Sequence, residues 1–278
     1  MRLNDSSYTL VKTGDGSYTL HLKAYDEHMH SLSGAYEEAL LKHVLPSGIL
    51  NCGRDSLRVL DVGFGLGYNI LALLVELRRI GHPGRLTVIS IENDRSLLPA
   101  LRSIRFDDER DEIYAGIRDA YAGGPTQAGN GTISVRFGDG RKIISSLDDD
   151  FFDAVFFDPF SPSRNPELWT EDIFRHVYRM MNRDAVLTTY SSAPQVRAAL
   201  LSAGFIIGRG PSVGGKREGT LAAKTEIIRP IPDLDREELL GSIRAVPYRD
   251  PCLSAARDLI LNGRIEEMKR LRSEKKTS

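Results

Sequence analysis

The chain has 278 residues, of which 41% are hydrophobic, and it carries 37 lysines and arginines against 38 aspartates and glutamates. This size accommodates one large α/β domain with an accessory element, or at most two small domains. The near-zero net charge excludes a protein that binds polyanions through bulk charge, while a local basic patch remains compatible with it. Cys52 and Cys252 are its two cysteines and no CxxC occurs, which argues against a disulfide framework and a cysteine-rich zinc site.

The sequence gives no sign of membrane insertion or secretion. The longest apolar run, around 70–77, has about eight residues, whereas a spanning helix needs roughly 20. The first ten residues, MRLNDSSYTL, lack the apolar segment of a secretory signal. We therefore expect a soluble, cytoplasmic protein.

Residues 1–50 are expected to form an extension that precedes the main domain. Two strands at 7–11 and 17–21 flank the turn sequence Thr-Gly-Asp-Gly, which predicts a β-hairpin over 6–23. Residues 35–45 have the pattern of a short amphipathic helix that ends at Pro46.

Residues 51–228 alternate between short apolar strands and helices. Strands are predicted at 57–62, 86–91, 133–137, 153–157 and 185–190, and helices at 68–80, 97–105, 142–147, 167–181 and 193–203. Two further strands, 205–209 and 220–224, close the domain as an antiparallel edge hairpin, and the polar stretch 106–131 is expected to be partly loop. This alternation predicts an α/β domain with a mostly parallel, seven-stranded sheet and an antiparallel last strand, the pattern of Rossmann-like methyltransferases. Residues 229–278 are expected to form a mildly basic tail, helical over 253–272.

The glycine-rich segment Asp61–Asn69, DVGFGLGYN, is the most informative one. Its GxGxG spacing differs from the GxGxxG of dinucleotide-binding folds, and it holds no cation to bind a phosphate. An acid at the strand end suits a cationic ligand, and S-adenosylmethionine (AdoMet) has a sulfonium and an ammonium group and no phosphate. We expect Asp61 to hold that ammonium group directly or through water, although a tight strand–helix turn without a ligand is the alternative. The other loop residues expected to bind the cofactor are Gly63, Phe64, Gly65, Gly67 and Asn69.

Two more acids end the following strands. Glu92, with Asn93 beside it, suits the ribose hydroxyls of a bound nucleoside. Asp139, with Gly140 beside it, suits the exocyclic amine of adenine. A solvent-exposed strand-end carboxylate and a plain Asp-Gly turn are the respective alternatives. Three acids at three strand ends are more specific than any one, because ligands of open α/β sheets bind at that edge.

The fourth predicted strand ends in Asp158-Pro159-Phe160, followed by Ser161 and Pro162. This Asp-Pro-aromatic turn resembles the motif of amino-group methyltransferases. Methyl transfer moves positive charge onto the acceptor nitrogen, so acceptors aimed at that nitrogen stabilise the transition state. We expect Asp158 and the carbonyl of Pro159 to play this part, Asp158 also to take the amine proton, and Phe160 to belong to the catalytic set. Asp158 as a turn cap is the alternative.

Two other features suggest contacts with a substrate. Trp169, the single tryptophan, could stack on a base, but packing in the core or in a lid fits it equally well. Residues 193–224 carry five lysines and arginines and one acid. Lys216 and Arg217 lie in the predicted hairpin loop, where they could contact RNA phosphates or form a solvated charged loop.

Over residues ~20–225 the chain resembles the MnmC-like methyltransferases, AdoMet-dependent enzymes that make 5-methylaminomethyl(-2-thio)uridine at the tRNA wobble position. The most specific match is 152–174, FDAVFFDPFSPSRNPELWTEDIF, which is similar to the family's FDA-x-F-x-D-x-F-x-P-x-x-NP-x-x-W. The family often has Asp-Gly-Phe-Ala-Pro where this chain has Asp-Pro-Phe-Ser-Pro, a change that keeps the acid. The segment DVGFGLGYN and the GKRE of 215–218 match as well.

The same resemblance covers His30-Ser31, Gly34-Ala35 and Glu38. It implies that His30 and Glu38 lie near the site, whereas the residues alone suggest packing between hairpin and helix.

The resemblance implies AdoMet-dependent N-methylation of the 5-aminomethyl group of wobble (2-thio)uridine, with tRNA as partner and neither a metal nor a membrane involved. Many family members are fused to an FAD-dependent oxidase. Because only about 50 residues follow the methyltransferase domain and no second dinucleotide loop occurs, we expect a standalone methyltransferase. A monomer is plausible, and the oligomeric state is left open.

Three other interpretations compete. An aminopropyltransferase such as spermidine synthase shares the fold, but the basic loop 210–219 does not suit a polyamine site. A non-catalytic AdoMet- or tRNA-binding protein is disfavoured because all four acids are intact. A nicotinamide oxidoreductase is disfavoured by the negative charge of Asp61.

Overall fold

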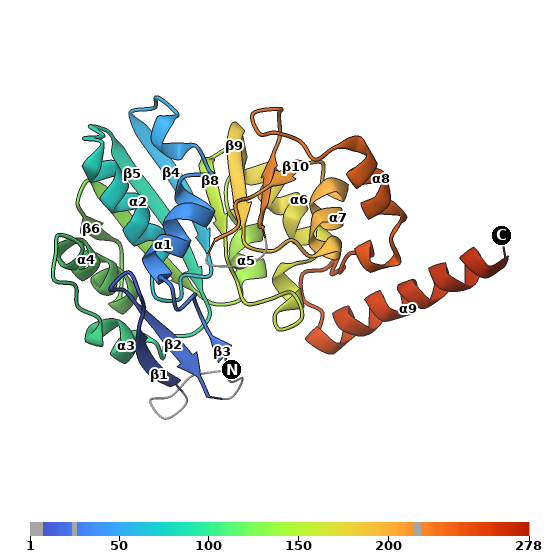
Figure 1. Ribbon diagram of the computed structural model, residues 1–278, viewed down its shortest axis with the longest axis horizontal. Coiled ribbons are helices and arrows are strands. Elements are labelled where there is room, and N and C mark those ends of the chain that lie inside the picture. The colour runs from blue at the N-terminus through green and yellow to red at the C-terminus, as the bar shows by residue number, and fades with distance from the viewer. Residues whose placement is uncertain (1–7, 24–26, 214–217, 278) are drawn as a thin grey trace.

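The computed structural model describes residues 8–23, 27–213 and 218–277, and a central sheet organises most of them (Figure 1). Its strands are β4 (Ser56–Val62), β5 (Arg85–Glu92), β6 (Thr126–Ala128), β7 (Gly131–Phe137), β8 (Phe152–Phe157), β9 (Met181–Thr189), β10 (Ile206–Arg209) and β11 (Thr220–Ala223). They lie in the order β10-β11-β9-β8-β4-β5-β7-β6. Strands β9, β8, β4, β5 and β7 run parallel, whereas β11 is antiparallel to both neighbours. The expected mostly parallel sheet with a reversed last strand is confirmed.

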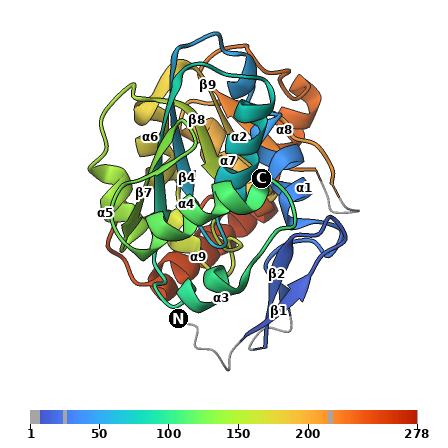
Figure 2. The same cartoon turned by 90° about the vertical axis from the view of Figure 1, so that its left-hand side faces the viewer.

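Helices cover both faces of this sheet (Figures 1 and 2). They are α1 (Ala35–Ala39), α2 (Tyr68–Arg79), α3 (Leu98–Ser103), α4 (Arg110–Ala122), α5 (Gly140–Ser145), α6 (Glu171–Met180), α7 (Pro194–Ser202), α8 (Asp233–Gly241) and α9 (Arg257–Thr277). Side chains alternate between the faces along each strand. Phe156 therefore packs in the core beneath α1, α2 and α4, and Phe157 packs in the core beneath α5, α6 and α7. Every residue of β8 is buried, which explains its continuous apolar sequence.

The stretch 106–131 is more ordered than its polar composition suggests. Helix α4 occupies thirteen of its residues, and β6 adds an eighth strand antiparallel to β7 at the edge of the sheet. The buried residues of α4 recur at helical spacing, and they are Ile113, Tyr114, Ile117, Ala120 and Tyr121. This amphipathic pattern was the signal for a helix, and the surrounding charges and glycines obscured it.

The N-terminal extension forms a separate antiparallel sheet of β1 (Tyr8–Lys12), β2 (Tyr18–Leu22) and β3 (Glu27–His28). The expected hairpin is thus confirmed, and it lies beside α3 (Figure 2). The expected helix over 35–45 is also present, although α1 widens into π-helical turns over Leu40–Val44. Such turns are rare in proteins and are frequent at functional sites.

The C-terminal segment docks beside the loop that follows β8. The backbone of Tyr248 pairs with Thr170 and accepts a hydrogen bond from Glu171 N–H at 3.0 Å. Beyond it, α9 projects from the body of the molecule (Figure 1). Within the ranges that the structure describes, no helix is both long and apolar enough to cross a bilayer.

Candidate active site

The acids singled out from the sequence lie along one edge of the sheet. Strands β4, β5, β7 and β8 are parallel neighbours, so their carboxyl ends lie side by side. Asp61 is in register with Phe156 of β8 and with Ser90 of β5, and Glu92 is in register with Phe137 of β7. Asp158 directly follows β8. The glycine loop, Asp61–Asn69, begins at the end of β4 and therefore lies between the end of β8 and the end of β5.

The glycine loop is held between β5 and the turn after β8. The N–H groups of Gly63 and Phe64 both donate to the carbonyl of Ile91 at 3.1 Å. Gly63 has a φ of +94°, and a Cβ atom there would lie 2.5 Å from the carbonyl oxygen of Asp158. Only glycine fits this close approach, in which the backbone of the loop packs directly against the backbone of the turn. The ring of Phe64 is buried, so this residue offers a ligand only its backbone.

Glu92 holds the loop through backbone hydrogen bonds. Its Oε1 accepts from Asn93 N–H at 2.7 Å and from Asp94 N–H at 2.9 Å, and its Oε2 accepts from Gly65 N–H at 3.0 Å. Burial raises the pKa of this carboxyl, and the three backbone donors oppose that rise. A carboxylate has about four acceptor positions, so the three hydrogen bonds from described residues leave one position on Oε2 for a hydroxyl donor.

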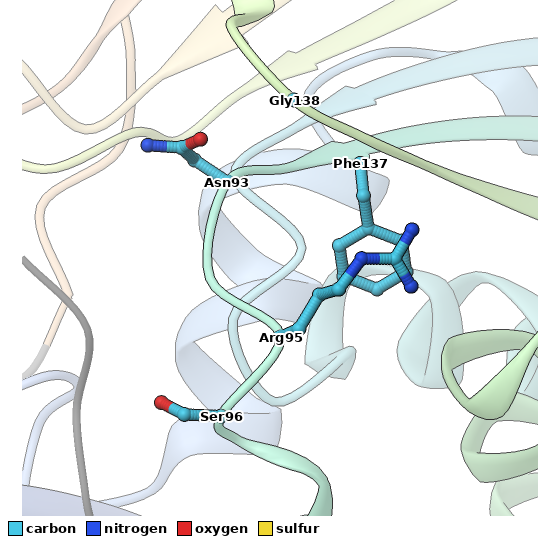
Figure 3. Close-up of a pocket in the computed structure, with 5 residues that line it drawn as sticks. All are labelled: Asn93, Arg95, Ser96, Phe137 and Gly138. Carbon is cyan, nitrogen blue, oxygen red and sulfur yellow. The ribbon is translucent and has the colours of Figure 1, made fainter.

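A hollow of about 490 Å³ lies beside Glu92, at the ends of β5 and β7 (Figure 3). The residues that line it are Asn93, Arg95, Ser96, Phe137 and Gly138. The Arg95 guanidinium lies over the Phe137 ring, 3.9 Å from its centre. Phe137 and Arg95 were not predicted from the sequence as site residues. A stacked guanidinium and aromatic ring next to a ribose-type acceptor suit a planar purine base.

Asp139 is engaged differently from the expectation. It caps α5 by accepting from Arg141 N–H at 3.0 Å, and its two oxygens also pair with the Arg141 guanidinium, at 2.7 Å for Nη2. Although burial opposes them, these hydrogen bonds lower the pKa of Asp139. Arg141 also pairs with the buried Asp250 at 2.8 Å. The structure therefore favours the turn interpretation, in which Asp139 helps to dock the C-terminal segment. Gly140 contributes close packing, since a Cβ there would lie 2.9 Å from Leu168 Cδ2.

Asp61 and Asp158 are bridged by one amide. Asn69 Nδ2 donates to Asp61 Oδ1 at 3.2 Å and to Asp158 Oδ2 at 3.3 Å, while the Ser90 hydroxyl donates to Asp61 Oδ2. Asp61 has no exposed surface, and burial raises its pKa to about 7. A direct contact between Asp61 and a ligand ammonium group is therefore not available. The side chain of Asp158 is 26% exposed and is the accessible carboxylate of the pair.

The turn after β8 is fixed through its carbonyl groups. The Tyr190 hydroxyl donates to the carbonyl of Pro159 at 3.0 Å, and Trp169 Nε1–H donates to the carbonyl of Phe160 at 2.8 Å. Trp169 is fully buried, with its ring edge-on to Phe157 and Tyr190. Stacking of Trp169 on a substrate base is therefore wrong, because neither face is open. In the turn after β8, Phe160 carries the exposed aromatic ring, and this residue is 51% exposed.

The N-terminal extension reaches the same edge of the sheet. A Cβ on Gly65 would lie 3.5 Å from Met29 Cε. Glu38 is buried, accepts from Ser31 N–H at 2.7 Å and pairs with the buried Lys42 at 2.9 Å. Burial raises the pKa of Tyr190, and the charges of Asp158 and Glu38 add to that rise.

The remaining predicted substrate residues are less informative. His30 donates its backbone N–H to the Thr19 hydroxyl at 2.9 Å and sets its ring edge-on to Tyr68, which are packing contacts. Lys216 and Arg217 lie outside the described residues. His43 was not predicted from the sequence. This buried side chain comes from the N-terminal extension, and its Nε2 lies 3.6 Å from Asp158 Oδ2. No spacing rule pointed to it.

Comparisons with known proteins agree with this geometry. A family model described as S-adenosyl-L-methionine-dependent methyltransferase matches residues 114–225. The crystal structure of MnmC2 from Aquifex aeolicus superposes with a TM-score of 0.81 and 32% identity, covering 97% of this chain and 88% of that one. The chain belongs to the MnmC-like family of AdoMet-dependent methyltransferases. The predicted family and fold class are thereby confirmed.

Two relatives are similar to this chain over most of its length. An uncharacterized protein of Methanocaldococcus jannaschii is 35% identical over 270 residues, which are 95% of this chain and 74% of the relative. The tRNA 5-methylaminomethyl-2-thiouridine biosynthesis bifunctional protein MnmC of Ralstonia nicotianae is 31% identical over 219 residues. That match covers 72% of this chain and 32% of the relative, so the chain spans about a third of the bifunctional protein's length.

Proposed function

We propose that this MnmC-like methyltransferase methylates the amino nitrogen of the 5-aminomethyl group on wobble (2-thio)uridine of tRNA. The observation that carries the proposal is the turn after β8, whose backbone packs against Gly63 and which bears the accessible carboxylate of Asp158 and the exposed ring of Phe160. The names of the bifunctional relatives support the choice of substrate.

The residues present fit AdoMet as the methyl donor. The acceptor capacity of Glu92 and the hollow lined by Phe137 and Arg95 suit a ribose and an adenine, respectively. When bound, AdoMet supplies an electrophilic methyl group on a sulfonium. The buried Asp61 supports the loop through Asn69, so we assign the ligand-facing negative charge to Asp158.

The chain's own residues orient the acceptor. Asp158 accepts an N–H of the substrate amine, directs the nitrogen lone pair towards the methyl group and stabilises the positive charge that develops on nitrogen. Because an ammonium group cannot attack, Asp158 first passes a proton from a protonated amine on to water, and it is ionised again when the methyl group transfers. Phe160 stacks on the uracil ring after the base has left the anticodon stack. The carbonyls of Pro159 and Phe160 stay in place through Tyr190 and Trp169.

The test uses labelled AdoMet and tRNA that carries 5-aminomethyluridine, followed by digestion and mass spectrometry of the nucleosides. We expect one methyl group on the aminomethyl nitrogen. The same assay with carboxymethylaminomethyl tRNA, and with spermidine plus decarboxylated AdoMet, distinguishes the alternatives. Label in the polyamine, or in no tRNA at all, would contradict the proposal.

A variant links the reaction to the turn after β8. Asp158→Asn keeps the shape of the side chain and removes the charge, so turnover should fall about 100-fold while AdoMet affinity stays within threefold. Asp184→Asn, at an exposed position of β9, is the matched control.

A further inference from the structure

We propose that His43 is a positioning residue that fixes the Asp158 carboxylate, so that the N-terminal extension completes the active site. This inference rests on the proposed function of Asp158. His43 is 2% exposed and lies in the π-helical turns that follow α1. Its ring packs 5.9 Å from that of Phe156, two residues before Asp158. The side chain therefore enters the methyltransferase domain at the end of β8.

The two ring nitrogens of His43 have different partners. Nδ1 lies 2.9 Å from the hydroxyl oxygen of Thr188 on β9, and Nε2 lies 3.6 Å from Asp158 Oδ2. When the Thr188 hydroxyl donates to Nδ1, the ring proton resides on Nε2 and faces the carboxylate. The opposite tautomer would set the Nε2 lone pair against a carboxylate oxygen, which is repulsive. The hydrogen-bond network thus assigns Nε2–H as a donor towards Asp158.

Two donors converge on the same oxygen of Asp158. Asn69 Nδ2 approaches Oδ2 from α2, and His43 Nε2 approaches it from the extension. Oδ1 has no hydrogen bond from any residue that the structure describes. The contact of 3.6 Å is longer than a hydrogen bond, and such contacts often tighten when substrate binds. His43 and Asn69 therefore hold Oδ2 and turn Oδ1 towards the acceptor amine.

Other groups around His43 do not replace it as a donor to Asp158. Lys42 is paired with Glu38, and the Tyr190 hydroxyl donates to the carbonyl of Pro159. Loss of His43 would leave Asp158 with Asn69 as its one donor among the described side chains. A displacement of about 1 Å at a reacting group can cost roughly 100-fold in rate.

Two matched substitutions test the proposal. His43→Leu removes the donor and keeps most of the volume, and His43→Gln places an amide N–H near the position of Nε2. We expect kcat to fall about 10- to 100-fold in His43→Leu, with AdoMet affinity within threefold, and His43→Gln to restore most of the loss. Thr188→Val removes the hydroxyl that fixes the His43 tautomer, so its kcat should fall a few-fold. Thr189→Val on the same strand is the comparison.

The outcomes separate this inference from the proposed function. If the wild-type protein does not methylate 5-aminomethyl tRNA, the proposed function fails. If it does, and His43→Leu keeps kcat within threefold or His43→Gln is as impaired as His43→Leu, the positioning role fails. Crystal structures of wild type and His43→Leu test the role without any substrate. Asp158 should change or lose its orientation in the variant, and an unchanged, well-ordered Asp158 would overturn the proposal.

Discussion

Asp61 should make the stability of this protein depend on pH, because burial raises the pKa of its carboxyl from 3.8 to about 7. Between those values the unfolded chain is ionised at this residue while the folded protein still holds the proton. Folding then takes up a proton, so the free energy of unfolding falls as pH rises. Each pH unit corresponds to about 1.4 kcal/mol. The contribution is fully present below about pH 4, and about 4 kcal/mol of it is lost by about pH 7.

Asp61→Asn removes this dependence and can keep both hydrogen bonds. The introduced amide would accept from Asn69 through its oxygen and donate to the Ser90 hydroxyl through its nitrogen. The difference in unfolding free energy between variant and wild type should therefore grow by about 4 kcal/mol from about pH 4 to about pH 7 and then level off.

Urea unfolding of both proteins at intervals of half a pH unit measures this difference, and the subtraction cancels the titration of all other groups. Asp184→Asn, at an exposed position, is the control, and its difference in unfolding free energy from the wild type should stay nearly constant with pH. A difference for Asp61→Asn that stays constant within about 1 kcal/mol would show that the folded protein already ionises Asp61 at low pH, which would refute the reasoning.

Three further substitutions test separate parts of the site. In Glu92→Gln the amide N–H would face the N–H of Gly65, so AdoMet binding measured by calorimetry should weaken about tenfold. A change of twofold or less would contradict the role of Glu92. Arg141→Met leaves the buried Asp250 without its cation and should destabilise the fold by about 3 kcal/mol and expose the C-terminal segment to protease, whereas unchanged urea unfolding would remove that link. Phe160→Leu should reduce kcat/KM for tRNA about tenfold and leave the unfolding midpoint unchanged, because the ring is half exposed, and a lowered midpoint would identify a packing residue instead.

The sequence predicted the sheet well because parallel strands buried on both faces are continuously apolar. FDAVFF and LRVLDV became the adjacent strands β8 and β4, and the acids at their ends came together because parallel strands end at one edge. Helix α4 was missed because its apolar residues are spread among charges, although their helical spacing was present.

Contacts between distant segments account for the features of the site that the sequence did not reveal. The sequence left base stacking and core packing of Trp169 equally open, and the structure shows the packing, in which Phe157, Phe174 and Tyr190 surround the ring. Asp139 has the local sequence of a cofactor ligand, but its partner Arg141 bonds to Asp250, 109 residues further along the chain.

Asp61 and Asp158, which are bridged by Asn69, differ in burial and in role. Asp61 has no exposed surface, burial raises its pKa to about 7, and it contacts the loop through hydrogen bonds from Asn69 and Ser90. Asp158 keeps a quarter of its side chain exposed, and His43 faces it from the other side. Two adjacent carboxylates that were both ionised would repel each other across a single amide. The raised pKa of the buried Asp61 lessens that repulsion and leaves Asp158 as the accessible carboxylate for a cationic reaction centre.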